Sequence, residues 1–103
     1  MVTITEQSIK SEIREVFQHM ETSLRGYKVI LFGSRARGNA DPSSDFDMGV
    51  IGEHPLDLKS FYKIADALEE LPTLYRIDWV DLNRTSEKLR KQALKEGKVL
   101  YEG

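Results

Sequence analysis

Two aspartates and a glycine–serine pair are the residues of this sequence whose types and spacing could do chemistry. The pair Gly33-Ser34 ends one apolar run, and Asp45 and Asp47 begin the next. In an extended strand alternate side chains share a face, so the two carboxylates would lie on one face, about 6.6 Å apart along the chain. Two carboxylates close to a turn rich in backbone N–H groups suit a hard cation that carries a nucleotide triphosphate.

A polar hairpin is the plain alternative for this segment. Asp, Ser, Pro and Asn are common turn residues, and an isolated Asp-x-Asp pair is weak evidence of a cation site. A further aspartate in a later strand-like stretch, residues 75–82, favours the cation site when it is taken together with the first two.

Asp78 and Asp81 are the two candidates for that third carboxylate. Strand alternation places Asp78 on one face with Arg76, and Asp81 on the other face with Trp79. A charge in mid-strand is costly unless something pairs with it, and either a metal ion or a neighbouring Arg or Lys could do so. Asp81 lies at the end of the strand, where a solvated acid or a helix cap costs little. The residues alone leave both candidates open.

These residues resemble the signature of a known family. The string Gly33-Ser34-Arg35-Ala36-Arg37-Gly38, followed by Ser44-Asp45-Phe46-Asp47, is similar to that of the DNA polymerase beta nucleotidyltransferase superfamily. In particular it resembles the minimal nucleotidyltransferases, the small partners of HEPN-domain proteins. The resemblance runs from about residue 29 to residue 81. It implies that the third acid of the family, which falls in mid-strand, is Asp78.

The resemblance also implies a site for two Mg²⁺ ions held by the three carboxylates. Asp45 and Asp47 would hold the nucleotide-bound ion and bridge to the second ion. Asp78 would complete the second site and help to deprotonate the acceptor hydroxyl. The general two-metal scheme assigns one ion to the attacking oxygen and the other to the leaving pyrophosphate.

The turn after the first apolar run is expected to bind the phosphates of the nucleotide. Gly33 leaves space for a phosphate to approach the backbone, and the Ser34 hydroxyl can donate a hydrogen bond to it. Arg35 and Arg37 follow, and an Arg can bond phosphate oxygens bidentately. Both cannot point inward from one helical turn, so we favour Arg35 over Arg37, with a solvated surface position as the alternative for each.

The function that the resemblance implies is a Mg²⁺-dependent transfer of AMP from ATP to a hydroxyl group. The implied acceptor is a tyrosine of a HEPN toxin, which makes this chain the antitoxin of a toxin–antitoxin pair and part of a hetero-oligomer. The first helix and residues 94–101 are the expected docking surfaces, because neither supplies catalytic groups. Two alternatives remain: a non-catalytic module that neutralises its partner by contact, and transfer to a small molecule such as an aminoglycoside.

Length and composition bound these functions. At 103 residues the sequence predicts a single minimal nucleotidyltransferase domain, residues 1–103, without room for a second domain that grips a substrate. A net charge of −2 gives no general attraction to phosphates, so nucleic acid is not expected as a direct partner. The absence of cysteine fits a reducing cytoplasm, and no apolar run approaches the ~20 residues of a membrane span. We therefore expect a cytoplasmic protein without a membrane segment.

Periodicity and chain breakers predict the elements that position these residues. The order α-β-β-α-β-α suits an α/β (α+β) fold, a small mixed β-sheet flanked by helices, as the polymerase-beta-like resemblance implies. Phe46 and Trp79 alternate with the acids and should lie in the core. In the last helix, Leu89 and Ala93 should face inward, and residues 87–92 otherwise form a solvated face. The expected elements are a helix at 6–24, a strand at 28–32, a helical turn at 35–39, a strand at 45–51, a helix at 58–71, a strand at 75–82, a helix capped by Thr85 or Ser86, and a short strand at 99–101.

Overall fold

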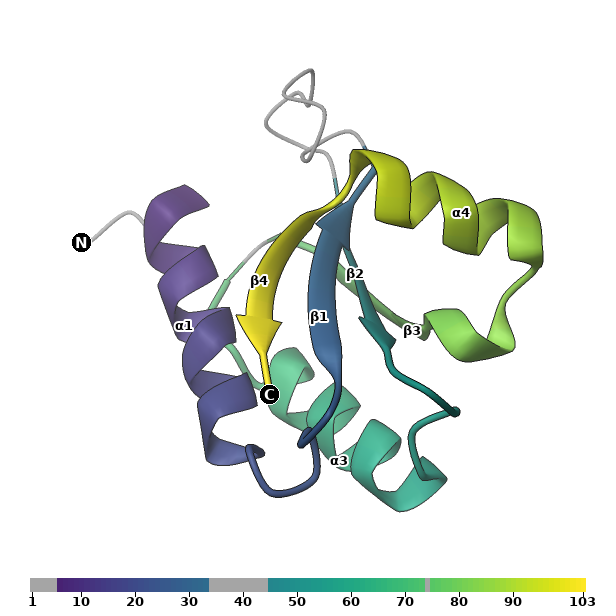
Figure 1. Cartoon of the computed structure of the whole chain (residues 1–103). Coiled ribbons are helices and arrows are strands. Elements are labelled where there is room, and N and C mark those ends of the chain that lie inside the picture. Colours follow the sequence, from purple (N-terminus) through teal and green to yellow (C-terminus); the bar gives the residue numbers. More distant parts are fainter. Residues whose placement is uncertain (1–5, 34–44, 74) are drawn as a thin grey trace.

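The computed structural model describes residues 6–33, 45–73 and 75–103, which form a β-sheet with helices on both faces (Figure 1). Within these residues the sheet has four strands in the order β3-β2-β1-β4, accompanied by three α-helices and one 3₁₀ helix. This is the mixed architecture that the sequence predicted. In chain order the elements are α1 (Glu6–His19), β1 (Lys28–Phe32), β2 (Phe46–Ile51), α3 (Leu58–Glu69), β3 (Ile77–Asp81), η1 (Leu82–Arg84), α4 (Glu87–Glu96) and β4 (Lys98–Glu102).

The sheet is mixed because its strands are joined in two different ways. β1 pairs antiparallel with both β2 and β4, whereas β2 pairs parallel with β3. A parallel pair needs a crossover connection, and α3 supplies it between β2 and β3. This crossover sets Asp47 of β2 opposite Asp78 of β3. The topology therefore fixes the relation between the two acids.

The two faces of the sheet are covered unequally. Helices α1 and α3 lie against one face, and α4 lies against the other near one end of the strands (Figure 1). Alternate residues of β2 point into the α1–α3 side, where Phe46, Met48 and Val50 are completely buried. The intervening residues, Asp47 among them, point to the α4 side. A smaller apolar cluster there contains Ile30, Leu82 and Ala93.

Several boundaries differ from the expected ones, for local reasons. Helix α1 ends at His19, and residues 20–26 form turns that close at Gly26, whose φ is +84°. Ser86, rather than Thr85, caps α4 by accepting a hydrogen bond from the Leu89 N–H at 3.2 Å. The short strand expected at 99–101 is the longer β4 and pairs with β1. The helical turn expected at 35–39 lies outside the described residues.

Leu89 was expected to face inward but is 36% exposed. Its neighbour on the same face, Ala93, is buried as expected. The difference arises because α4 covers only part of its face of the sheet. None of the described helices is long and apolar enough to cross a membrane.

Candidate active site

Asp47 and Asp78 lie side by side on neighbouring strands. The parallel register of β2 and β3 sets them directly opposite each other, and Phe46 opposite Ile77. Residues opposite each other in a pair of strands project to the same face of the sheet, so both carboxylates project away from the α1–α3 core. Asp45, partly buried, stands two residues before Asp47 and just ahead of β2. All three acids of the expected site thus fall at one end of the β2–β3 pair.

Asp78 forms an ion pair with Arg76, the kind of contact that was expected as the alternative to a metal ion. Its Oδ1 lies 3.5 Å from Nε of Arg76, and the two side chains are 40% and 77% exposed. An exposed ion pair of this kind contributes about 0–1 kcal/mol. So weak a contact leaves the carboxylate available to a stronger ligand.

The chemistry of the donor set fits Mg²⁺. Among the described residues no group of three His, Cys, Asp or Glu side chains is arranged to hold a metal ion. Mg²⁺, however, is usually bound through one or two carboxylates together with waters and substrate phosphates, so a complete cage of protein ligands is not required. The adjacent Asp47 and Asp78 satisfy that smaller requirement, and Asp45 can add a third oxygen donor.

Gly33 is required by two separate features of this site. Its φ is +77°, in the left-handed region that side chains other than glycine seldom adopt. A Cβ at this position would also overlap Oδ2 of Asp47. The end of β1 therefore presents bare backbone to the Asp47 carboxylate, and the binding of phosphate by Gly33 stays a prediction. Ser34, Arg35 and Arg37 lie outside the described residues, and their expected contacts with phosphate stay a prediction.

Helix α4 contributes a wall that sequence reasoning did not assign to the site. A cavity of about 230 Å³ lies between Gly33, Asp47 and one face of this helix. Gln92 was expected to be on a solvated face, yet it lines this cavity together with Glu96. The signal was present in the spacing i, i+3, i+4 and i+7, which places four residues on one helical face. The residues that α4 contributes are Leu89, Gln92, Ala93 and Glu96.

A larger cavity, of about 470 Å³, lies on the other side of Asp78, between β3 and the second half of α3. It is lined in part by the aromatic side chains of Tyr75 and Trp79. The two adjacent acids are therefore flanked by two cavities, one beside Gly33 and one beside α3.

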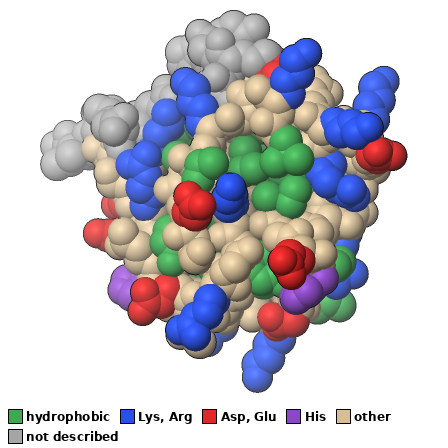
Figure 2. Space-filling view, viewed as in Figure 1, with side chains coloured by type: hydrophobic (Ala, Val, Ile, Leu, Met, Phe, Trp, Pro, Cys, Tyr) green, Lys and Arg blue, Asp and Glu red, His purple; other side chains and the backbone are tan. Residues whose placement is uncertain are grey.

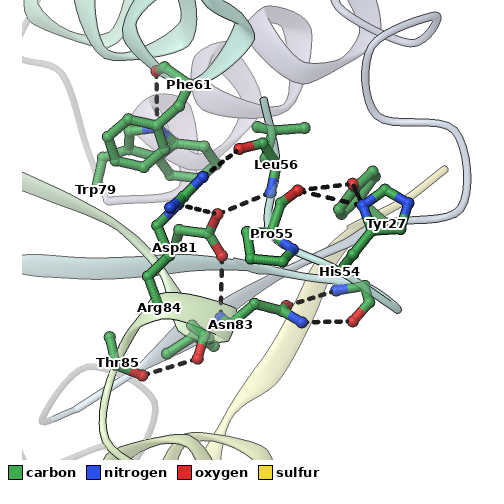
Figure 3. Close-up of polar contacts among 12 residues, drawn as sticks. Tyr27, His54, Pro55, Leu56, Phe61, Trp79, Asp81, Asn83, Arg84 and Thr85 are labelled. Carbon is green, nitrogen blue, oxygen red and sulfur yellow. Dashed lines mark hydrogen bonds and ion pairs between the residues drawn. The ribbon is translucent and has the colours of Figure 1, made fainter. Parts of the chain in front are cut away.

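Asp81, the rival candidate for the third acid, is bound to backbone N–H groups on the opposite face (Figure 3). Its Oδ2 accepts a hydrogen bond from Leu56 N–H at 2.8 Å, and its Oδ1 accepts one from Asn83 N–H at 3.0 Å. Nε of Arg84 lies 3.6 Å from Oδ2. The expected capping role is confirmed, since Asp81 is the N-cap of η1. The other alternative for Asp81, a solvated acid, is wrong, because its side chain is only 4% exposed.

Phe46 and Trp79 lie in the core, as predicted. The Trp79 ring stacks on Phe61 with centroids 5.5 Å apart, and its Nε1–H donates to the Phe61 carbonyl at 3.1 Å. Its other neighbour is Phe17, also at 5.5 Å. The aromatic residues thus hold β3 against α1 and α3, with Asp78 on the outward side.

Comparison of the sequence with models of known protein families identifies the family of this chain. The family model described as polymerase beta, nucleotidyltransferase matches residues 9–103. The chain belongs to this nucleotidyltransferase family. The resemblance found in the sequence is therefore confirmed over most of the chain.

Individual relatives narrow the comparison within the nucleotidyltransferase family. A protein of Haemophilus influenzae named "Probable protein adenylyltransferase MntA" is 32% identical, over 99% of this chain and 90% of its own length. A chain in a crystal structure of a toxin–antitoxin with AMP-PNP is 25% identical with a TM-score of 0.63, over 91% of this chain and 73% of that one. A chain from the complex of a tri-AMPylated Shewanella oneidensis HEPN toxin with an MNT antitoxin has a TM-score of 0.67 at 24% identity, over 96% and 74%, and shares the fold.

Proposed function

We propose that this nucleotidyltransferase transfers AMP from ATP to a hydroxyl side chain of a HEPN-domain toxin and so acts as its antitoxin. The observation that carries the proposal is the register of β2 and β3, which sets Asp47 beside Asp78 with the bare backbone of Gly33 against Asp47. The relative from Haemophilus influenzae, matched over nearly the whole chain, is named as a protein adenylyltransferase. The solved toxin–antitoxin with AMP-PNP supports a nucleotide donor and a toxin partner.

Each acid has a distinct part in the proposed reaction. Asp45 and Asp47 would hold the Mg²⁺ that accompanies the triphosphate, and Asp78 would complete a second Mg²⁺ site. Ions bound there would supply Lewis-acid stabilisation of the charge on the phosphates and on the leaving group. Asp78 also receives the proton of the acceptor hydroxyl, and its exposed contact with Arg76 is too weak to prevent this.

The transfer itself balances without a further reactant. The acceptor oxygen forms a bond to the α-phosphorus, and the bond from the α-phosphorus to the oxygen that bridges to the β-phosphate breaks. Pyrophosphate leaves, and the hydroxyl proton passes to the Asp78 carboxylate. The backbone of Gly33 lets the phosphates approach Asp47, and Ser34 with Arg35 or Arg37 is proposed to bind their oxygens.

The partner is proposed to dock on exposed apolar surface outside the site. Leu94 of α4 is 51% exposed and Val99 of β4 is 52% exposed, and both belong to the segment that the sequence singled out for docking. Figure 2 shows hydrophobic side chains exposed on this face of the molecule, with Lys and Arg side chains around them. Such a mixed surface suits a protein partner better than nucleic acid.

The test is label transfer to the partner. The chain is incubated with Mg²⁺, ATP labelled on the α-phosphate and a HEPN-domain protein as the candidate partner. The expected result is label on a hydroxyl side chain of that protein, with release of one pyrophosphate per label. Asp47→Asn should abolish transfer, whereas Asp66→Asn, at an exposed acid of α3, should not. Neutralisation of the toxin without label would show a binder that acts by contact, and label on an aminoglycoside or tRNA would show a different acceptor.

A further inference from the structure

The cavity between Gly33, Asp47 and α4 is too small for a whole nucleotide. Its volume of about 230 Å³ lies below the roughly 300–1,000 Å³ that is common for sites that take a complete small-molecule ligand. It adjoins Asp47, the acid proposed to hold the Mg²⁺ of the triphosphate, and Gly33, where the phosphates are proposed to approach the backbone. Its size and position therefore suit one part of the donor nucleotide.

The walls of this cavity come from one face of the sheet and one face of α4. Phe32 of β1 lies opposite Asp47 of β2, so their side chains project to the same face of the sheet. Helix α4 lies against this face, close to the end of β1 (Figure 1). The α4 residues that line the cavity are Leu89, Gln92, Ala93 and Glu96. Their spacing puts them on one side of the helix, so the two walls face a common occupant.

The chemistry of the walls suits a base better than a phosphate group. Asp47 and Glu96 each bring a carboxylate, and none of the described lining residues is a lysine or an arginine. Phosphate groups are repelled by such walls except where a metal ion neutralises them. Phe32, Leu89 and Ala93 provide apolar surface, against which the flat face of a base can pack. The phosphates thus belong with Mg²⁺ beside Asp47, and the rest of the cavity is left for the base.

Gln92 is the one side-chain amide among the described walls. An amide carries both N–H donors and a carbonyl acceptor. Adenine presents the complementary edge, an amino group beside a ring nitrogen, whereas guanine presents a carbonyl oxygen beside a ring nitrogen, which are both acceptors. Glu96 follows one turn later and, when ionised, is an acceptor only, so it also favours the amino group of adenine.

On the basis of the proposed function, we infer that this cavity is the subsite for the base of the donor and that Gln92 selects adenine. The ring packs against Phe32 on the side of the sheet and against Leu89 on the side of α4. The Gln92 carbonyl accepts a hydrogen bond from the amino group of adenine, and the Gln92 N–H donates one to the neighbouring ring nitrogen. Selection of the base therefore lies in α4, apart from the acids that bind the metal.

Isothermal titration of the full chain in Mg²⁺ tests this subsite with three probes. They are a non-hydrolysable ATP analogue, the matching GTP analogue and inorganic tripolyphosphate, which has no base. The unmodified chain should bind the ATP analogue about tenfold more tightly than the GTP analogue. Gln92→Ala should lose about tenfold in affinity for the ATP analogue and keep its affinity for tripolyphosphate. Asp47→Asn should lose affinity for both.

A matched control makes the same chemical change at a distance from the cavity. Gln18, like Gln92, is an exposed glutamine of a helix, but it belongs to α1. Gln18→Ala should bind all three probes like the unmodified chain. Because both positions are exposed, both variants should keep the Tm of the unmodified chain.

NMR measures the position of the base directly. With the ATP analogue bound, the ring protons of adenine should show nuclear Overhauser effects to the methyl groups of Leu89 and Ala93. The methyl groups of Leu94 should show none, because this residue is exposed on α4 outside the cavity.

The outcomes separate this inference from the proposed function. Unchanged affinity of Gln92→Ala for the ATP analogue, no binding of that analogue by the unmodified chain, or no contact of adenine with Leu89 and Ala93 would overturn the base subsite. Label transfer to the HEPN-domain partner by the same protein would leave the proposed function intact. Selective loss of ATP affinity in Gln92→Ala, in a chain that labels no partner, would support the subsite and contradict the proposed function.

Discussion

Two aspartates three residues apart on β3 have opposite environments. The side chain of Asp78 is 40% exposed and contacts one exposed arginine, whereas that of Asp81 is 4% exposed and accepts hydrogen bonds from two backbone N–H groups. The odd spacing along a strand puts them on opposite faces of the sheet. The Asp81 carboxylate joins distant parts of the chain, and the Asp78 carboxylate stays partly exposed beside the cavity between α3 and β3. The same residue type therefore serves structure or chemistry according to the face on which it lies.

The register of the parallel strands β2 and β3 explains why Asp78 and Asp81 have such different environments. Asp78 lies opposite Asp47, while Asp81 lies opposite the fully buried Val50. A carboxylate on the buried face must have its oxygens satisfied, because an unpaired buried charge costs several kcal/mol. Asp81 meets this requirement through the N–H groups of Leu56 and Asn83. Asp78 is under no such requirement.

From this comparison of Asp78 with Asp81, we predict the largest effect for a substitution of Asp78, and we predict it on the rate of transfer. Asp78→Asn removes the proposed proton acceptor, and general-base groups contribute typically 10²–10⁴-fold to rate. The rate of label transfer should fall by about that factor, while the Tm stays within the error of the unmodified chain because the carboxylate makes only an exposed ion pair. Initial rates of label transfer check the predicted loss of activity, and thermal melts check the unchanged Tm. Normal transfer by this variant would remove Asp78 from the mechanism.

For Asp81 we expect the substitution to lower the stability of the fold. Asp81→Ala leaves the N–H groups of Leu56 and Asn83 without an acceptor, and the loss of charge-assisted hydrogen bonds should lower the free energy of unfolding by about 3 kcal/mol. Urea unfolding measures this change. Asp78→Ala is the matched control and should leave the unfolding midpoint in place. If Asp81→Ala were as stable as the control, the hydrogen bonds of Asp81 would carry no net stabilisation.

A smaller effect is expected at Gly33, where a substitution should change both the stability and the affinity for nucleotide. Alanine at φ +77° should cost about 1–2 kcal/mol in stability, since left-handed backbone is disfavoured for residues with a Cβ. The added methyl group also overlaps the Asp47 carboxylate and must displace it. Gly33→Ala should therefore weaken the binding of Mg²⁺–ATP as well, which isothermal titration measures. Gly26→Ala is the control: it has a similar φ of +84° but open space around it, so it should lose stability and keep nucleotide affinity.

Sequence patterns predicted the local part of this site and missed the part built from distant segments. Alternation was enough to put Phe46 in the core, and glycine followed by serine marked the end of β1. The burial of Asp81 could not be seen, because its partner at Leu56 is 25 residues away and meets it only after α3 crosses the sheet. The contribution of Gln92 was missed for a similar reason, since its neighbours Gly33 and Asp47 belong to other strands.

The smallest predicted effect links Asp81 to the titration of Tyr27. Burial raises the pKa of the Tyr27 hydroxyl, and the negative charges of Asp81 and Asp57 raise it further. The folded chain therefore favours the neutral hydroxyl. Its contribution to stability is complete below the ordinary tyrosine pKa of about 10 and is lost as the pH rises through the raised pKa.

Asp81→Asn removes one cause of that raised pKa and keeps the larger one, burial. The difference between the folded and unfolded pKa of Tyr27 should narrow, so the free energy of unfolding should fall less between neutral and alkaline pH than in the unmodified chain. Asp78→Asn, on the opposite face, should leave the alkaline fall unchanged, and the other titrating groups contribute equally to both variants. Urea unfolding at a series of pH values measures the two slopes. Equal slopes would mean that the charge of Asp81 does not affect the titration of Tyr27.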